Sequence, residues 1–185
     1  MECGYRFLQS SWINLLFILI GNDYYLFVLF RYILFEILIM RIIVNRVTST
    51  KEKNICFSIR RKVFIDEQRI DEKIEMDDNK FESNSFIASV NKTYVGTARC
   101  RSTKNGVKLE RFAVLKPFRG SGVGKSLIIF MLKYLKKEKY IYLHAQSDVI
   151  EFYSKFGFHL VGEPFNEADI THQKMVYTQN PQDIF

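Results

Sequence analysis

The spacing of hydrophobic positions changes several times between Met40 and the C-terminus, and each change predicts a new element of secondary structure. In residues 124–137, apolar side chains recur at the i, i+3, i+4, i+7, i+8 spacing that places them on one face of a helix. The side chains predicted to be buried on this face are Leu127, Phe130, Met131, Tyr134 and Leu135.

Short apolar runs bounded by turn residues predict strands instead of helices. The predicted strands are residues 41–47, 86–90, 93–101, 107–115, 140–143, 158–161 and 174–177. Further helices are predicted from a cap at residues 48–50 to near Gln68, and from Asp148 or its neighbour to Lys155. Residues 66–78 are acidic and weakly periodic, which indicates a loop or a second short helix.

The turns between the predicted strands indicate the fold class. Asn91-Lys92 separates two strands as a hairpin turn would, and Asn105-Gly106 is a pair that joins antiparallel strands. The predicted fold is α/β in the α+β sense, a mixed and mostly antiparallel twisted sheet flanked by helices.

The N-terminal residues 1–39 have a different pattern, with runs dense in Leu, Ile and Phe at 12–20 and 24–39. Neither run reaches the roughly 18–20 uninterrupted apolar residues of a membrane span, because charged residues interrupt the second run. Two interpretations stay open: a membrane-associated extension, or a stretch absent from the functional protein. Residues 40–185 make up the predicted domain, which is expected to be cytoplasmic unless the extension attaches it to a membrane.

Composition favours one globular domain with a sizeable core, since 48% of the residues are hydrophobic and 25% are charged. The net charge of +7 comes from dispersed basic residues, which favours attraction of an anionic cofactor over nucleic-acid binding. The three cysteines have no metal-ligand spacing, which predicts free thiols, a reducing compartment and no bound metal.

The segment Arg119-Gly120-Ser121-Gly122-Val123-Gly124 follows a strand-like run and opens the predicted helix at 124–137. Glycines allow close backbone approach to a ligand, and free N–H groups at a helix start favour a phosphate or diphosphate. The dinucleotide fingerprint requires a carboxylate about 20 residues later, where this chain has Ala145-Gln146. The nucleoside triphosphate loop requires glycine at the position of Arg119. We therefore interpret the segment as an Arg-x-x-Gly-x-Gly diphosphate loop.

This loop resembles the pyrophosphate loop of the GNAT superfamily of acyl-CoA N-acyltransferases, and the resemblance extends over about the last four fifths of the chain. Residues 109–115, 143–146 and 152–158 are also similar to segments of the family, and residues 61–68 and 162–165, with His172 and Met175, are similar to one small single-domain branch of it. The resemblance implies a GNAT-like fold for residues 40–185, acetyl-CoA as co-substrate, no metal, and transfer of an acetyl group to an amine.

The resemblance also implies roles for individual residues. Tyr153 corresponds to the group that protonates the departing CoA thiolate, and Glu110 to a general base near the point where family sheets splay apart. A backbone N–H of Phe112 or Val114 would support the oxyanion. The implied cofactor-binding residues are Phe112, Ala113, Val114, Arg119, Gly120, Ser121, Gly122, Val123, Gly124, Lys125, Ser126, Tyr153 and Lys155.

The acceptor is expected near the first helix and its following loop, which cover the mouth of the cleft in the family. The implied acceptor-binding residues are Glu67, Gln68, Asp77, Arg111, His144 and His172, with His172 expected in the loop of the last hairpin. Acidic side chains suit a cationic amine, although a solvated acidic loop explains them equally well. Glucosamine 6-phosphate, on a route to a nucleotide-sugar precursor such as UDP-N-acetylglucosamine, is the most specific hypothesis, beside polyamines, amino acids and aminoglycoside-like amines.

Other functions stay open beside acetylation of a small amine. A protein lysine or N-terminal acetyltransferase would need an open peptide groove. A non-catalytic CoA-binding module would have no turnover, against which the presence of Glu110 and Tyr153 argues. A membrane-anchored scaffold would depend on residues 1–39 alone. The sequence does not decide between a monomer and a homodimer.

Overall fold

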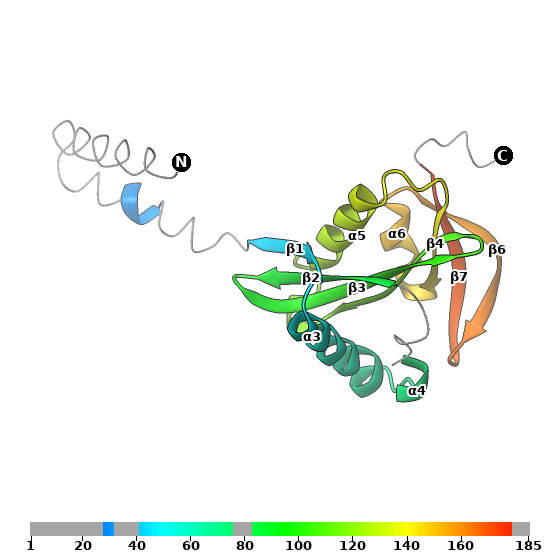
Figure 1. The fold of residues 1–185 in the computed structure, drawn as a ribbon, viewed down its shortest axis with the longest axis horizontal. Coiled ribbons are helices and arrows are strands. Elements are labelled where there is room, and N and C mark those ends of the chain that lie inside the picture. The colour runs from blue at the N-terminus through cyan, green and yellow to red at the C-terminus, as the bar shows by residue number, and fades with distance from the viewer. Residues whose placement is uncertain (1–27, 32–40, 76–82, 179–185) are drawn as a thin grey trace. The chain divides into compact units, whose positions relative to one another are not determined.

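The computed structural model describes residues 28–31, 41–75 and 83–178, and the chain divides into two units, residues 1–40 and 41–185. Of the first unit only a helical turn is described, so most of the two apolar runs noted in the sequence lie outside the described residues (Figure 1). Among the helices in the described part of the chain, none is both long and apolar enough to cross a bilayer.

The second unit is built on one sheet, which has seven strands in the described residues. The strands are β1 (Ile42–Arg46), β2 (Ser83–Val90), β3 (Thr93–Thr103), β4 (Gly106–Val114), β5 (Ile141–Gln146), β6 (Phe158–Glu167) and β7 (Ile170–Tyr177). Their spatial order is β1-β2-β3-β4-β5-β7-β6. Of the described neighbouring pairs, only β4 and β5 are parallel, which confirms the predicted mixed, mostly antiparallel sheet.

The hairpin turns are formed where the sequence predicts them. Asn91 and Lys92 both adopt positive φ, 48° and 69°, as a two-residue turn between antiparallel strands requires. The last hairpin is longer than predicted, because β6 and β7 continue to a tight turn at Ala168 and Asp169. His172 therefore lies within β7, and its predicted place in the hairpin loop is wrong.

The first helix changes from an α-helix to a π-helix along its length. α3 (Thr50–Arg60) begins after the cap residue Ser49, whose hydroxyl accepts the backbone N–H of Glu52 while the Glu52 carboxylate accepts the backbone N–H of Ser49. The chain continues as a π-helix, η1 (Arg61–Glu67), and ends near Gln68 as predicted. The wider π-turn is common at functional sites, and the apolar spacing did not distinguish it from an α-helix.

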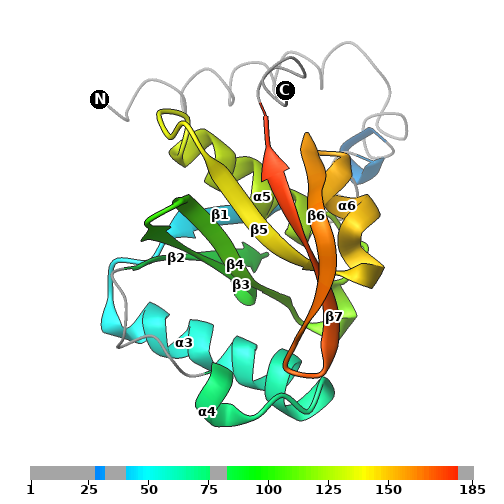
Figure 2. The ribbon, with the colours of Figure 1, turned by 90° about the vertical axis from the view of Figure 1, so that its right-hand side faces the viewer.

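Helices cover both faces of the sheet. α4 (Glu72–Glu75) follows η1, so the acidic segment does contain a second short helix. α5 (Val123–Tyr134) follows β4, and α6 (Ile150–Ser154) follows β5 after a 3₁₀ turn at Ser147–Val149. α3 and α4 lie on one face, whereas α5 and α6 lie on the other (Figures 1 and 2).

The main core lies between the sheet and α5. Leu127, Ile128 and Met131 are fully buried there, whereas Tyr134 is 44% exposed, so its predicted burial is wrong. Tyr134 is the last residue of the helix, and its ring packs in a T-shaped arrangement against Phe86, with 5.3 Å between ring centroids. The buried face of α5 therefore includes Ile128, which was not predicted, and leaves out Tyr134.

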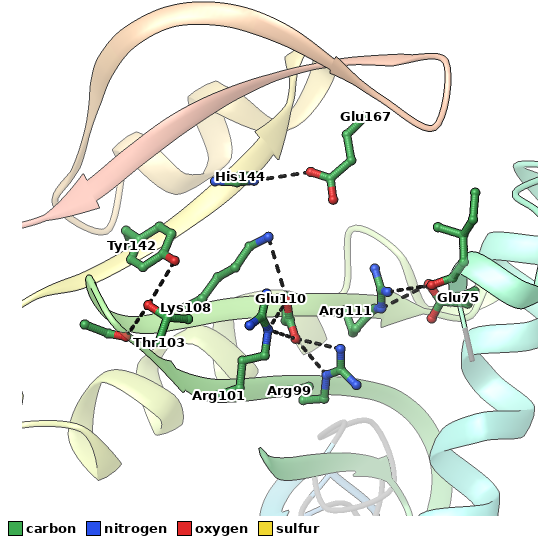
Figure 3. Close-up of polar contacts among 12 residues, drawn as sticks. Glu75, Arg99, Arg101, Thr103, Lys108, Glu110, Arg111, Tyr142, His144 and Glu167 are labelled. Atoms are coloured by element: carbon green, nitrogen blue, oxygen red, sulfur yellow. Dashed lines mark hydrogen bonds and ion pairs between the residues drawn. The ribbon is translucent and has the colours of Figure 1, made fainter. Parts of the chain in front are cut away.

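A buried ion cluster joins α3, α4 and β4. The Glu75 carboxylate, 1% exposed, lies 2.6 Å from Nε of Arg60. It also lies 3.1 Å from Nε of Arg111 (Figure 3). Burial raises the pKa of Glu75, while Arg111 and Arg60 oppose this effect by favouring the charged carboxylate. Because Arg60 is buried as well, the cluster depends on the negative charge at Glu75.

Replacement of Glu75 by alanine is therefore expected to lower the free energy of unfolding by about 3 kcal/mol or more, because it leaves buried cationic charge without its carboxylate. Urea denaturation measures the change. Glu72→Ala is the matched control on the same helix, since Glu72 pairs with Arg61 at the surface and such pairs contribute less than about 1 kcal/mol. Equal losses in the two variants would contradict a structural role for the buried cluster.

Candidate active site

β4 and β5 run side by side only at their beginnings. Their register ends with the pair Leu109 and Leu143 in the described chain, after which the strands diverge. A β-bulge lies beside this point, where the β3–β4 register shifts and Arg111 adopts a φ of 57°. Beyond Leu109, β4 has no registered partner in β5, so its backbone near Arg111 and Phe112 lies beside the gap between these two strands.

The glycine-containing loop lies just beyond the C-terminal end of β4. Gly122 is the N-cap residue of α5 with a φ of 93°, and Gly120 has a φ of 77°, both in the left-handed region that favours glycine. A Cβ at Gly120 would meet no atom within 4 Å, so the backbone is open to a ligand there. Ser121 does not face this space, because its hydroxyl donates to the Phe118 carbonyl at 2.6 Å.

The start of α5 completes an anion site. The first intrahelical bond runs from the Ser126 N–H to the Gly122 carbonyl, at 2.9 Å. Residues 123–125 therefore present N–H groups that have no intrahelical acceptor, at the positive end of a 12-residue helix. Together with the ammonium group of Lys125, they form a site suited to a diphosphate.

Arg119 ties this loop to the end of η1. Its guanidinium donates to the Val114 carbonyl at 2.9 Å and pairs with the Glu67 carboxylate at 2.6 Å. Glu67 is thus engaged with the loop arginine, and the structure gives no direct support for its predicted contact with the acceptor. These contacts hold the Arg119 guanidinium at the loop entrance, while the Glu67 carboxylate balances its charge.

One cavity of about 730 Å³ extends from the loop into the gap between the diverging strands. The cofactor end is lined by Phe112, Val114, Arg119, Gly120, Gly122, Gly124, Lys125, Tyr153 and Lys155. The opposite end is lined by Gln68, Ile70, Ile74, Lys108, Glu110, Arg111, His144, Gln146, Glu167 and His172. Two ligands can therefore meet near the point where β4 and β5 separate.

Tyr153, on α6, lines the cavity. Its ring packs edge-on against Phe112, Phe152 and Phe158, at centroid separations of 5.6, 5.0 and 6.0 Å. Burial raises the pKa of Tyr153, and the nearby charge of Asp148 acts in the same direction, so the hydroxyl stays neutral and able to donate. Among the described residues, none forms a hydrogen bond with this hydroxyl.

Glu110 lies among basic side chains (Figure 3). Its carboxylate is within 2.6 Å of Nη2 of Arg99 and 3.1 Å of Nε of Arg101, and Nζ of Lys108 lies 3.8 Å away. Arg99 is fully buried, so the first of these pairs anchors the carboxylate to β3. Alternation along β4 and β3 places all four side chains on the face of the sheet that α3 and α4 partly cover.

His144 and Glu167 form a second polar pair at this end of the cavity. Nδ1 of His144 lies 3.2 Å from a carboxylate oxygen of Glu167, which joins β5 to the end of β6 (Figure 3). The hydrogen bond with His144 lowers the pKa of Glu167 to about 2, although burial opposes the shift. The imidazole also packs edge-on against Phe165, at 4.8 Å between ring centroids.

Two further contacts shape the acceptor end. The side-chain amides of Gln68 and Gln146 hydrogen-bond at 3.3 Å, which links η1 to the end of β5 across the cavity. Nδ1 of His172 donates to the Ile170 carbonyl at 2.8 Å, which leaves Nε2 as the other ring nitrogen beside the cavity.

Most of the residues predicted from the sequence lie along this one cavity. The exceptions among the described residues are Glu67, Ala113, Ser121, Val123 and Ser126. Ala113 and Val123 are buried in the cores, the Ser121 hydroxyl donates to Phe118, the Ser126 N–H bonds within α5, and Asp77 lies outside the described residues. Lys108, Gln146 and Glu167 were missed, although Lys108 and Gln146 share the strand alternation of Glu110 and His144.

Comparison with known proteins agrees with this geometry. Residues 48–179 match the family described as acetyltransferase (GNAT) domain. The chain is 36% identical over 138 residues to the Bacillus subtilis protein YyaT, covering 71% of this chain and 93% of that protein. It is 32% identical to the B. subtilis N-acetyltransferase YjcF, covering 65% and 88% of the two chains. The crystal structure of Escherichia coli ElaA superposes with a TM-score of 0.66 and 26% identity, covering 75% of this chain and all of ElaA.

The chain therefore belongs to the GNAT acetyltransferase family, as the sequence resemblance predicted. It is an N-acetyltransferase that uses acetyl-CoA as co-substrate. The loop geometry fits that co-substrate, because the free N–H groups at the start of α5 suit its diphosphate.

Gly122→Glu is expected to raise the Kd for CoA by about 100-fold or more, equivalent to about 2.8 kcal/mol, because it places a carboxylate beside the diphosphate site. Isothermal titration calorimetry measures the affinity. Gly162→Glu is the control, since Gly162 has a similar φ of 75° and its added Cβ meets no atom within 4 Å, but it lies outside the cavity. Unchanged affinity in Gly122→Glu would contradict the loop assignment.

Proposed function

We propose that this acetyltransferase acts on the primary amine of a small molecule, which enters the cavity at the end opposite the diphosphate loop. The observation that carries this proposal is the continuous cavity itself, which joins the CoA loop to a polar end of limited size. Gln68 and Gln146 bridge part of this end, which favours a compact acceptor over a long peptide.

The charges at the acceptor end support an amine that also carries an anionic group. Lys108 and Arg111 line the cavity beside the carboxylates of Glu110 and Glu167. Carboxylates suit an ammonium group, and basic side chains suit a phosphate or carboxylate on the same molecule. Glucosamine 6-phosphate and amino acids are two acceptors of this chemistry.

Transfer of an acetyl group from a thioester to an amine requires a neutral amine, a polarised carbonyl and a proton for the thiol product. In our proposal, the backbone N–H of Phe112 or Val114 supports the carbonyl oxygen. The neutral Tyr153 hydroxyl donates to the departing sulfur. Two side chains near the point of strand divergence have the chemistry to accept the ammonium proton: Glu110, which the sequence resemblance implies, and His144.

Tyr153→Phe is expected to lower kcat by about 10²-fold while CoA affinity is retained, because the phenyl ring preserves the aromatic packing and removes only the donor. Steady-state kinetics and calorimetry with CoA separate the two effects. Tyr177→Phe is the control, since Tyr177 also packs against Phe158 but does not line the cavity. An unaltered kcat in Tyr153→Phe would remove its role as acid.

The acceptor is tested by measuring CoA release from acetyl-CoA with the full chain and a panel of amines. The panel contains glucosamine 6-phosphate, glucosamine, spermidine, several amino acids and a lysine peptide. We expect saturable turnover with a small amine, and higher kcat/KM when that amine carries an anionic group. Preference for the peptide would contradict the proposed acceptor class, and CoA binding without any turnover would favour a non-catalytic module.

A further inference from the structure

The hydrogen bond between His144 and Glu167 fixes which ring nitrogen can accept a proton. An ionised carboxylate has no proton to donate, so Nδ1 of His144 must carry the hydrogen that joins the pair at 3.2 Å. In the neutral imidazole, Nε2 then holds the free lone pair. Both His144 and Glu167 line the cavity, so the pair belongs to the acceptor end.

The surroundings hold the imidazole in place. Phe165 packs edge-on against the ring at 4.8 Å between centroids, and the Tyr142 ring lies tilted to it at 5.9 Å. Glu167 reaches the ring from the end of β6, where the Ala168–Asp169 turn returns the chain into β7. The β6–β7 hairpin thus holds the Glu167 carboxylate against His144 of β5. Histidine bases in other enzymes are likewise oriented by a third group.

Glu110 is less suited to accept a proton. One carboxylate oxygen contacts both Arg99 and Arg101, at 2.6–3.1 Å, and the other lies 3.2 Å from Arg101 and 3.8 Å from Lys108. A proton on this carboxyl would remove the negative charge that balances a fully buried arginine. The geometry favours a structural role for Glu110.

We propose that His144 is the general base of this acetyltransferase and that Glu167 is its positioning residue, an inference that rests on the proposed acetylation of an amine. An N–H bond of the acceptor ammonium breaks, and its proton moves to Nε2 of His144. The nitrogen lone pair then attacks the thioester carbonyl carbon, and the C–S bond breaks. The sulfur receives a proton from Tyr153, the second proton lost by the acetylated nitrogen restores the Tyr153 hydroxyl, and His144 releases its proton to solvent.

The base assignment predicts a particular pH dependence. The titratable groups packed around His144 are Lys108 and Glu110 on β4, Tyr142 on β5, Glu167 on β6, and His172 and Lys174 on β7. Glu167 stays ionised across the assay range and stabilises the imidazolium. Loss of that charge makes His144 a weaker base, so the acid limb of kcat/KM moves to lower pH and the plateau falls.

The experiment measures kcat/KM against pH for the wild type, three test variants and two control variants, with the panel amine that the wild type turns over fastest. We expect His144→Gln to lower the plateau by about 10²-fold or more and to remove the acid limb, with CoA affinity retained. Glu167→Gln should shift the limb to lower pH, whereas Glu110→Gln should keep an acid limb. His159→Gln and Glu163→Gln, both exposed on β6 and outside the cavity, are the matched controls. Loss of the limb in Glu110→Gln, with its retention in His144→Gln, would overturn the proposal.

A second measurement tests the pair without any acceptor. Nitrogen-15 NMR of the histidine rings in the wild type should show the His144 tautomer with the proton on Nδ1. The same spectra across pH should show His144 titrating at a lower pH in Glu167→Gln than in the wild type. The opposite tautomer, or equal titration, would overturn the pairing. The NMR results can be as expected even if no panel amine is acetylated. In that case the proposed acceptor class is wrong, whereas the assignment of Nε2 as the proton-accepting nitrogen stands.

Discussion

The early end of the parallel pairing between β4 and β5 is the constraint on which the site depends. A parallel pair normally continues along both strands, but here the last registered pair is Leu109 and Leu143, and the bulge at Arg111 turns β4 away. The divergence opens one cavity between the anion site at α5 and a polar end between η1 and the last hairpin. It also brings Glu110, His144 and Tyr153, from three different elements, to the same cavity. The backbone itself forms this gap. A co-substrate bound at the α5 loop can therefore reach an acceptor that enters from the other end of the cavity.

One face of the sheet carries the main apolar core, and the other face carries the charged side chains beside the candidate site. The face under α5 is apolar and carries the main core, with Leu127, Ile128 and Met131 fully buried. On the other face, α3 covers only a small apolar cluster around Ala113, and ion pairs fill the space beside it. Glu75 balances Arg60 and Arg111 near the bulge, whereas Glu110 balances Arg99 and Arg101 beyond it. Charged groups can lie at this depth because each carboxylate faces more than one guanidinium, and this network also gives the acceptor end its polar lining.

Features that depend on neighbouring residues could be predicted from the sequence. Features that depend on contacts between distant segments could not. The glycine loop, the Asn91-Lys92 turn and the Ser49 cap each depend on a few neighbouring residues, and the structure contains all three. Strand alternation could also have identified Lys108, which lies two residues before Glu110. The His144–Glu167 pair has no such signal, because it exists only when the β6–β7 hairpin folds back beside β5. Glu67 was expected at the acceptor from its place at the end of the first helix and from its charge, whereas its pairing with Arg119 depends on how η1 ends against the loop.

A crystal structure of the full chain with bound CoA tests the central claim most directly, since the claim is that one cavity holds the co-substrate and presents its sulfur to the acceptor end. The account predicts the diphosphate on the backbone N–H groups of residues 120–125 and the sulfur within hydrogen-bond distance of the Tyr153 hydroxyl. The pantetheine arm should follow β4 beyond the bulge, with His144 on the acceptor side of the sulfur. CoA bound outside the gap between β4 and β5, or a sulfur far from both Tyr153 and His144, would contradict the account.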